Sequence, residues 1–250
     1  MIYFIGAGPG SVDLITVRGA EILGRSDMII YAGSLVNPEL VKKYACVNCE
    51  LYDSAGMTLT EIADKLISGH NRGLTVARLH SGDPALYGAI REQIRILSEK
   101  KIPFEIVPGV SSLFAASAAM KCEYMIPEVS QTLIITRLEG RTPVPERESV
   151  KALAAHNSSM AVFLSASMID RLCSELIAGG YDPASPAAIV YRASWPDERV
   201  IAGTLGTLPE IAKVSGITKS ALILVGEFLN DNINVNSKLY DGNFSHEFRK

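Results

Sequence analysis

The sequence predicts an α/β protein of two domains. Short apolar runs alternate with segments whose apolar residues recur at helical spacing, which is typical of mainly parallel or mixed sheets covered by helices. This alternation occurs twice, on either side of a stretch without periodicity, and 250 residues are enough for two domains of ordinary size. We therefore place the domains at residues 1–120 and 132–229, with a linker at 121–131 and a polar tail at 230–250.

Four apolar runs predict the strands of the first domain. They are Tyr3–Ile5, Met28–Tyr31, Leu74–Leu79 and Phe104–Val107. Between the second and third runs, apolar residues in Leu59–Ile67 fall on one helical face. Thr58 and Glu61 form a capping box at the start of this helix, and Gly69 is expected to end it. Two more helices are expected, one marked by Ile90, Ile94 and Leu97 and the other at Ser111–Met120.

The second domain repeats this pattern. Its predicted strands are Thr132–Thr136, Met160–Leu164, Ala187–Tyr191 and Ala221–Val225. Ile169–Ile177 has the same apolar spacing as the earlier helix. Arg137–Glu148 contains two prolines and several charges, and we interpret it as a long loop with a functional or mobile role.

The composition excludes several classes of protein. Hydrophobic residues make up 48% and charged residues 20%, which is typical of a globular chain. The formal net charge is -3, and no basic stripe is interleaved with aromatics, which argues against a nucleic-acid partner. No apolar run approaches the ~18 residues that span a bilayer. Met1 leads directly into a strand pattern, so neither a membrane nor a leader is expected and the cytoplasm is the expected compartment.

Cys46 and Cys49 form a Cys-x-x-Cys pair, which is compatible with a metal or redox site. A zinc site needs two more ligands, and no second pair of cysteines or histidines has suitable spacing. The pair also lacks the aromatic and proline neighbours of a thioredoxin-like motif. We therefore expect no metal and favour ordinary cytosolic thiols over a redox function.

The loop Gly6-Ala7-Gly8-Pro9-Gly10 directly follows the first strand, where α/β sheets bind ligands. One alternative is a dinucleotide-binding fingerprint, but Ser11 replaces its third glycine and Pro9 has no N–H for a pyrophosphate. Asp27 has the spacing of the fingerprint's acidic residue, yet it begins the second strand instead of ending it. The other alternative is a tight turn without a ligand, and this remains open.

Two further strand ends carry specialised turns. Ser81-Gly82-Asp83 follows the third strand, and a helix is expected to begin near Pro84. Asp83 has two interpretations, a ligand contact and an N-cap of that helix. After the fourth strand, Pro108-Gly109 is followed by hydroxyl side chains at a helix start. We expect these two turns and the glycine loop to form one rim.

These motifs carry a resemblance to a known family. Ile5–Gly10 followed by Leu14–Gly19, and then Val76–Gly109 with its Gly82-Asp83 and Tyr87-Gly88 pairs, resemble the two signatures of the tetrapyrrole methyltransferases. The resemblance covers roughly residues 1–229. It implies two α/β domains with S-adenosylmethionine in the cleft between them, a tetrapyrrole substrate and a homodimer.

The resemblance also implies which residues surround the cofactor. In the first domain they are Pro9, Ser81, Gly82, Asp83, Leu86, Ser111 and Ser112; in the second they are Leu164, Ala193 and Ala221. Leu164 stands where family members often have methionine.

Several segments are similar to particular members of the family. The segments that resemble members methylating carbon 11 of precorrin-4 are Tyr31–Val36, Gln131–Arg137, Glu139–Pro143 and Tyr191–Pro196. Of these, Glu139–Pro143 also resembles the cobalt-dependent, anaerobic branch, as does the ending Phe244–Lys250. The implied reaction is methylation of carbon 11 of cobalt-precorrin-4, or of precorrin-4, in cobalamin biosynthesis. The alternatives are methylation at another ring carbon and a non-catalytic tetrapyrrole carrier.

Methyl transfer from a sulfonium needs little chemical activation, because the donor is already activated. Holding the two reactants in line can contribute ~7–11 kcal/mol, so no catalytic residue is assigned. Arginines suit the substrate's carboxylates. The candidates are Arg18, Arg78, Arg137, Arg141 and Arg192, and Arg137 at a strand end is preferred. His80 is a candidate base or hydrogen-bonding group, and Tyr31 is expected to face the same rim. Each candidate also has an alternative without function. The arginines are then solvated surface residues, His80 is an ordinary strand-end residue, and Tyr31 packs in the core.

Overall fold

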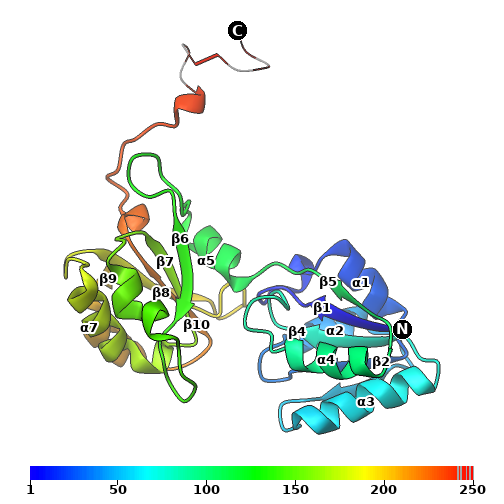
Figure 1. Ribbon diagram of the computed structural model, residues 1–250. Coiled ribbons are helices and arrows are strands. Elements are labelled where there is room, and N and C mark those ends of the chain that lie inside the picture. The colour runs from blue at the N-terminus through cyan, green and yellow to red at the C-terminus, as the bar shows by residue number, and fades with distance from the viewer. Residues whose placement is uncertain (241, 243, 246, 248, 250) are drawn as a thin grey trace. The chain divides into compact units, whose positions relative to one another are not determined.

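The computed structural model describes residues 1–240, 242, 244, 245, 247 and 249. The chain divides into two compact units. The first unit comprises Met1–Ala115 and Ala193–Asp197, and the second comprises Ala116–Arg192 and Glu198–Lys250. Among the described residues each unit contains a five-stranded sheet covered by helices (Figure 1), which confirms the α/β fold class.

The first sheet is parallel throughout its described strands, in the order β3-β2-β4-β1-β5. The strands are β1 (Ile2–Gly6), β2 (Met28–Tyr31), β3 (Glu50–Asp53), β4 (Val76–His80) and β5 (Phe104–Val107). Because the carboxyl ends of parallel strands meet at the same edge of a sheet, the three specialised turns of the sequence start from one edge.

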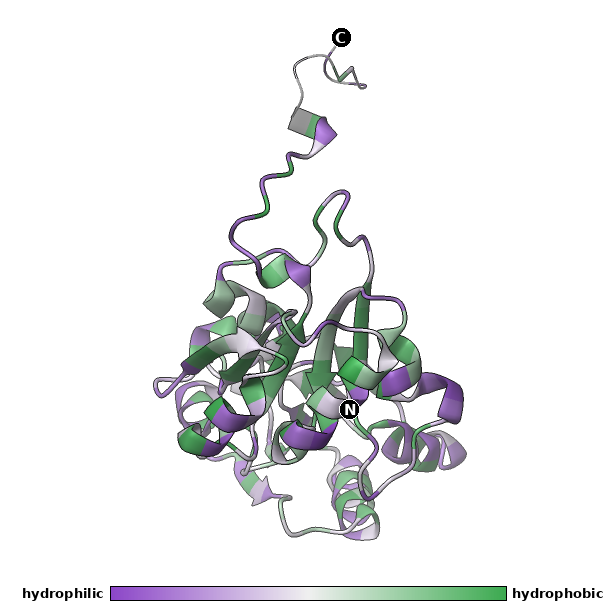
Figure 2. Ribbon diagram, turned by 90° about the vertical axis from the view of Figure 1, so that its left-hand side faces the viewer, coloured by the Kyte–Doolittle hydropathy of each residue, from purple (hydrophilic) through white to green (hydrophobic). Residues whose placement is uncertain are grey.

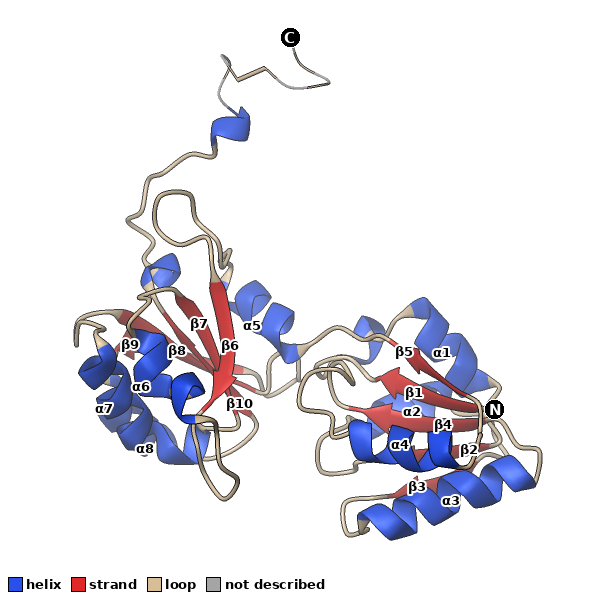
Figure 3. Ribbon diagram, viewed as in Figure 1, coloured by secondary structure: helices blue, strands red, loops and turns tan. Residues whose placement is uncertain are grey.

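Helices cover both faces of the first sheet. On one face lie α1 (Val17–Gly24) and α2 (Pro38–Tyr44), whose side chains pack against Ile5, Ile29 and Leu79. On the other face α3 (Leu59–Asn71) and α4 (Arg91–Glu99) pack against Phe4, Ile30 and Val76. Figure 3 shows these helices in blue around the red strands. Apolar residues of both strand faces are therefore buried.

Helix α3 confirms the predicted start and corrects the predicted end. Thr58 Oγ1 accepts the N–H of Glu61, and the Glu61 carboxylate accepts the N–H of Thr58 at 2.7 Å, so the capping box forms. The expectation that Gly69 ends the helix is wrong, because the helix continues to Asn71. A Cβ on Gly69 would lie 2.7 Å from Val76 Cγ2. Gly69 therefore permits close packing of the helix against β4.

The second sheet is mixed, in the order β6-β7-β10-β8-β9. The strands are β6 (Leu133–Arg137), β7 (Ser159–Phe163), β8 (Pro186–Tyr191), β9 (Arg199–Thr204) and β10 (Ala221–Val225). The β6–β7 pair is parallel, while β7–β10, β10–β8 and β8–β9 are antiparallel. The core contains residues of α6 (Val150–Ala154), α7 (Ile169–Gly179) and α8 (Leu208–Ser215). Figure 2 shows hydrophobic residues concentrated in the strands.

The division between the units falls inside α5 (Ser112–Met120), ahead of the stretch 121–131 that the sequence indicates as a linker. The short 3-10 helices are Val12–Leu14, Glu146–Glu148, Ala166–Met168, Glu227–Leu229 and Lys238–Tyr240. Parts of the terminal segment Phe244–Lys250, whose sequence resembles the cobalt branch, lie outside the described residues. Among the described residues, no helix has both the length and the apolar character needed to cross a bilayer.

Candidate functional site

The three turns at the carboxyl edge of the first sheet contact one another, as the sequence predicts. The N–H of Ala7 donates to the carbonyl of His80 at 2.7 Å, and the N–H of Gly82 donates to the carbonyl of Gly8 at 2.8 Å. Gly8 and Gly82 thereby form an isolated antiparallel bridge. Gly8 has a φ of 79°, and a Cβ there would lie 2.8 Å from the carbonyl oxygen of Leu14, so the bridge requires glycine at this position.

The third turn packs against the other two at backbone distance. A Cβ on Gly6 would lie 2.5 Å from Gly109 Cα and 2.6 Å from the Gly82 carbonyl oxygen. A Cβ on Gly82 would lie 3.6 Å from Ser111 Cα. No side chain fits between the backbone of Gly6 and those of Gly82 and Gly109, and the expectation that the turns form one rim is confirmed.

Asp83 connects two of the turns through its carboxylate. Oδ1 accepts the N–H of Ala85 at 2.7 Å, and Oδ2 accepts the N–H of Gly109 at 2.8 Å. The expectation of a helix beginning near Pro84 is wrong, because residues 84–87 form turns and α4 begins at Arg91. Asp83 is therefore not the N-cap of such a helix. Each carboxylate oxygen has two lone-pair directions, so both oxygens retain capacity to accept a bond from a ligand.

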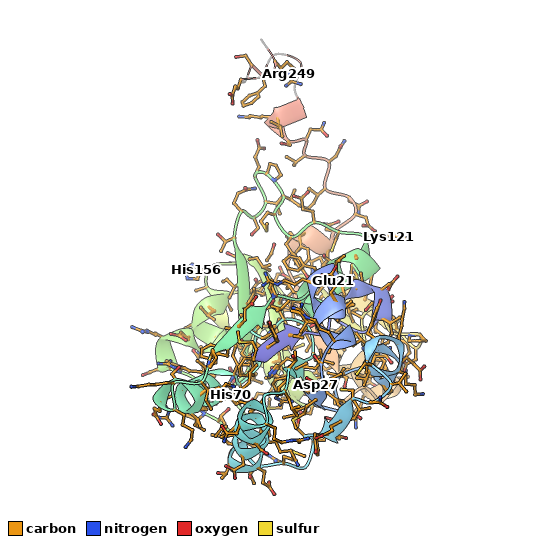
Figure 4. All side chains as sticks on the ribbon, turned by 90° about the vertical axis from the view of Figure 1, so that its right-hand side faces the viewer. Glu21, Asp27, His70, Lys121, His156 and Arg249 are labelled. Carbon is orange, nitrogen blue, oxygen red and sulfur yellow. The ribbon has the colours of Figure 1, made fainter. Side chains whose placement is uncertain are left out.

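The glycine loop has few N–H groups available for a phosphate. Those of Ala7 and Gly8 donate to the turn after β4, Pro9 has none, and that of Ser11 donates to Ser194 Oγ at 3.0 Å. A dinucleotide loop needs such groups for its pyrophosphate. Asp27, labelled in Figure 4, precedes β2, and its Oδ2 accepts the N–H of Thr75. Both observations argue against a dinucleotide site.

Other residues that the resemblance places around the cofactor lie on the same rim. Pro9 and Ser111 are buried, Ser81 and Ser112 are half-buried, and the Leu86 N–H donates to the carbonyl of Asp83. Ser111 Oγ accepts the N–H of Leu113, just inside α5. Pro9, Ser81–Asp83, Leu86 and Ser111 are thus brought together in the first unit.

His80 lies beneath this rim and is buried. Its ring stacks on Phe4 with centroids 6.0 Å apart. Burial lowers the pKa of His80 to about 3, with a further contribution from the neighbouring Arg78. Its buried Nε2 has no hydrogen-bond partner in the described part of the chain. His80 is therefore neutral at ordinary pH, and a role as a base or substrate contact stays a prediction.

Arg78 is also buried and contacts neutral groups. Its Nη1 donates to Ser54 Oγ at 2.9 Å, and its Nε donates to Gln93 Oε1 at 3.3 Å. Burial lowers the pKa of its guanidinium to about 10. Arg78 therefore links the ends of the strands below the rim. Arg18, another candidate arginine, instead forms an exposed ion pair with Glu105.

Tyr31 and Asp53 are the last residues of β2 and β3, which lie on the side of β4 opposite to β1. Tyr31 is half-buried, and its carbonyl accepts the N–H of Ser54 at 2.8 Å. Asp53 Oδ1 accepts the N–H groups of Gly33 and Ala55, and these bonds hold the pKa of its carboxyl below the usual value. Asp53 was not predicted as a residue of this edge, because strand β3, which it ends, was not predicted.

The second unit has a cavity of about 330 Å³. It is lined by Arg137, Leu138, Gly140, Arg141, Thr142, Leu164, Ser167 and Met168. Leu164 follows β7 with a φ of 55° and is 67% exposed, which is uncommon for leucine. Arg137 and Leu164, two predicted site residues, therefore line the same cavity. Ala221, another, begins β10 opposite Tyr191 and is half-buried.

The guanidinium of Arg137 binds its own loop. Nη2 donates to the carbonyl of Pro143 at 2.8 Å, and Nη1 donates to that of Thr142 at 3.2 Å. These contacts fold the loop that the sequence predicts after β6. Arg141 in the same loop is exposed beside the cavity, so it is the more accessible of the two cations.

Trp195 and Ser194 were missed by the sequence analysis. Trp195 Nε1 donates to the carbonyl of Pro9 at 2.9 Å, beside the buried Ala193. The available signal was that Trp195 is the single tryptophan of the chain and lies in the segment Tyr191–Pro196, which carries the resemblance.

Both thiols of the Cys46–Cys49 pair donate to backbone carbonyls. Cys46 Sγ donates to the carbonyl of Ser26 at 3.3 Å, and burial together with the neighbouring Cys46 raises the pKa of Cys49 to about 12. The cysteines are free, and the described residues contain no group of three or more potential metal ligands.

Residues 1–209 match the model of the tetrapyrrole (corrin/porphyrin) methylase family. The cobalt-precorrin-4 C(11)-methyltransferase of Methanocaldococcus jannaschii is 55% identical, covering 100% of this chain and 96% of the relative. The precorrin-4 C(11)-methyltransferase of Pseudomonas aeruginosa is 45% identical, covering 99% and 98%. The X-ray structure of a cobalt precorrin-4 methyltransferase, CbiF, is 44% identical and has a TM-score of 0.89, covering 92% of this chain and 95% of that one.

Proposed function

Because this chain belongs to the tetrapyrrole (corrin/porphyrin) methylase family, we propose that it methylates carbon 11 of cobalt-precorrin-4, with S-adenosylmethionine as the donor. The products are cobalt-precorrin-5 and S-adenosylhomocysteine. The observation that carries this proposal is the 55% identity, over the whole chain, to a relative named for this reaction. The rim of three turns is compatible with this donor, because it offers few N–H groups to a phosphate and S-adenosylmethionine has no phosphate group.

The residues of the rim suit a sulfonium donor. Asp83 supplies a carboxylate to the rim, and a carboxylate favours a positively charged ligand nearby. The N–H groups of Ala7 and Gly8 donate to the turn after β4, and that of Ser11 donates to Ser194. S-adenosylmethionine has no phosphate that would need these donors. We assign cofactor contacts to Pro9, Ser81, Gly82, Asp83, Leu86, Ser111, Ser112, Leu164, Ala193 and Ala221.

The reaction is an in-line displacement at the methyl carbon. The electron pair of an electron-rich ring carbon forms the new carbon–carbon bond as the methyl–sulfur bond breaks, and the electron pair of the broken bond stays on sulfur. The positive charge passes to the ring, which then releases one proton. The protein's contribution is to hold the donor and the ring carbon in line and to exclude water. No side chain has to act as a nucleophile.

For the substrate we propose contacts from Tyr31, His80 and Arg137, with Arg141 as the exposed guanidinium beside the cavity of the second unit. The substrate's acetate and propionate groups are suitable partners for guanidinium. The resemblance further supports a homodimer, and the four free thiols fit a reducing compartment such as the cytoplasm.

Turnover with labelled donor tests the function. The purified protein is incubated with cobalt-precorrin-4 and S-adenosylmethionine carrying a ¹³C-methyl group. We expect one methyl to be added, with its NMR signal assigned to carbon 11, and an equal amount of S-adenosylhomocysteine. Label at another ring carbon would identify a different methylase, and tetrapyrrole binding without S-adenosylhomocysteine would identify a carrier.

Cobalt-free precorrin-4 is the alternative substrate, because relatives 42–45% identical are named for it. A parallel incubation with precorrin-4 gives the ratio of kcat/KM for the two. We expect the cobalt form to be preferred, and a higher value for precorrin-4 would reverse this part of the proposal.

A further inference from the structure

The segment Ala193–Asp197 belongs to the first unit although its chain neighbours belong to the second. It connects β8 and β9, which pair as antiparallel strands up to Tyr191 and Arg199. Connections in such hairpins commonly have two to five residues and stay with their own sheet. This one instead packs on the glycine loop, and we call it the strap.

The strap contacts Pro9 and Gly10 of the glycine loop and the residue that follows it, Ser11. Trp195 Nε1 donates to the Pro9 carbonyl at 2.9 Å, and Ser194 Oγ accepts the N–H of Ser11 at 3.0 Å. Between these two bonds, a Cβ on Gly10 would lie 2.1 Å from Trp195 Cδ1 and 2.4 Å from Nε1. The indole ring therefore lies directly on the Gly10 backbone. Glycine at position 10 is needed for this contact.

A second bond holds the same stretch from another element. Asn37 Nδ2, at the N-cap of α2, donates to the Gly10 carbonyl at 2.8 Å. The carbonyls of Pro9 and Gly10 are thus both directed to protein donors. The stretch Pro9–Ser11 has no regular secondary structure of its own, so these long-range contacts determine its conformation.

The backbone of the strap is itself constrained. Ser194 in the strap has a φ of 66°, and Arg192, the residue just before the strap, has a φ of 45°. Non-glycine residues rarely adopt this conformation, and it persists where surrounding contacts determine it. This conformation presents Ser194 and Trp195 to the glycine loop.

We propose that Trp195 and Ser194 are positioning residues for the methyl donor, acting through Pro9–Ser11. The proposal rests on the proposed function, which places Pro9 and the strap residue Ala193 against the donor. A loop held in its bound conformation loses less entropy when the ligand binds. Loss of the strap contacts therefore weakens donor binding, whereas the rate of methyl transfer from the saturated enzyme changes little.

The test compares dissociation constants for S-adenosylhomocysteine, measured by calorimetry on the whole chain. Trp195→Phe and Ser194→Ala each remove one hydrogen bond and are expected to weaken binding about fivefold. Trp195→Ala also removes the ring and is expected to weaken it more than about tenfold. Val200→Ala, an exposed apolar position in β9, is the matched control and is expected to bind as the natural chain does.

A double-mutant cycle tests the contact itself. Gly10→Ala is expected to weaken binding strongly in the natural background, because its methyl group collides with the indole. In the Trp195→Ala background the same change has no ring to meet, so most of its effect should disappear. Circular dichroism identifies any variant that does not fold, in which case Trp195→Val, which also removes the ring, provides the cycle.

Three outcomes would overturn the proposal. They are unchanged dissociation constants in the Trp195 and Ser194 variants, an equal effect of Gly10→Ala in both backgrounds, and a loss of kcat with an unchanged dissociation constant. Failure of the proposed function is distinguishable, because there the natural chain itself would neither bind S-adenosylhomocysteine nor turn over.

Discussion

Two ionisable side chains, Arg78 and His80, are buried beneath the rim, and Arg78 donates its hydrogen bonds to neutral groups. Arg78 and His80 are 5% and 6% exposed and point to the same face of β4. The sequence identifies both residues, because they precede a Ser-Gly-Asp turn, but it does not show their burial. Their burial depends on α4, whose Gln93 contacts Arg78, and this partner is 15 residues away.

His80 makes the first unit sensitive to acid. Its pKa is lowered in the folded state, so between about pH 6.5 and about pH 3 the unfolded chain binds the extra proton. The contribution of His80 to stability is therefore present above pH 6.5 and is lost as the pH falls. We expect a slope of up to about 1.4 kcal/mol per pH unit in this range.

The measurement is urea unfolding between pH 4.5 and pH 7, followed by the fluorescence of Trp195, which reports on the first unit. His80→Gln removes the titrating group and should flatten the slope. His156→Gln changes an exposed histidine of the second unit and should leave the slope unchanged. Equal slopes for His80→Gln and the natural chain would contradict the assignment.

At the scale of single elements, the cap of α3 makes a measurable contribution to stability. Thr58→Ala removes the side-chain acceptor for the Glu61 N–H, and we expect it to lower the free energy of unfolding by about 1 kcal/mol. Thr60→Ala, an exposed change two residues later, should be neutral or slightly stabilising. Urea unfolding, followed by the fluorescence of Trp195, measures the free energy of unfolding of both variants. Equal values for Thr58→Ala and Thr60→Ala would show that the capping box contributes nothing to stability.

Among the described strands, all those in the interior of the two sheets were predictable, whereas two of the four edge strands were not. The runs Met28–Tyr31, Phe104–Val107 and Ala221–Val225 are strands with the predicted bounds. The missed strands β3 and β9 lie at the edges of their sheets. An edge strand need not be apolar, and the charged Glu50 and Asp53 hide the pattern of β3.

Two local errors have the same physical origin. Gly69 and Pro84 carry ordinary signals for a helix end and a helix start. Contacts between different elements override both, namely the packing of Gly69 on Val76 and the bond from the Gly109 N–H to Asp83. The rim itself was predictable, because glycine turns at several strand ends are a local feature of the sequence. The strap was not, because its two hydrogen bonds join residues that are 183 and 186 positions apart in the chain.

For the whole molecule, the proposed function links donor binding to stability. A ligand that binds only the folded state at one hundred times its dissociation constant adds about 2.7 kcal/mol to the free energy of unfolding. Asp83→Ala removes the carboxylate that bridges Ala85 and Gly109, and we expect it to weaken S-adenosylhomocysteine binding at least tenfold. At the same ligand concentration the variant should therefore gain no more than about 1.4 kcal/mol.

The control for this comparison is Asp53→Ala. Asp53 also accepts two backbone N–H groups at the carboxyl edge of the same sheet, so its loss has a similar structural cost. It has no assigned donor contact, and we expect the ligand to stabilise Asp53→Ala by the full 2.7 kcal/mol or so. Urea unfolding of each variant with and without S-adenosylhomocysteine measures the gain. An equal gain in both variants would reduce Asp83 to a structural link between two turns, because donor binding would then not depend on its carboxylate.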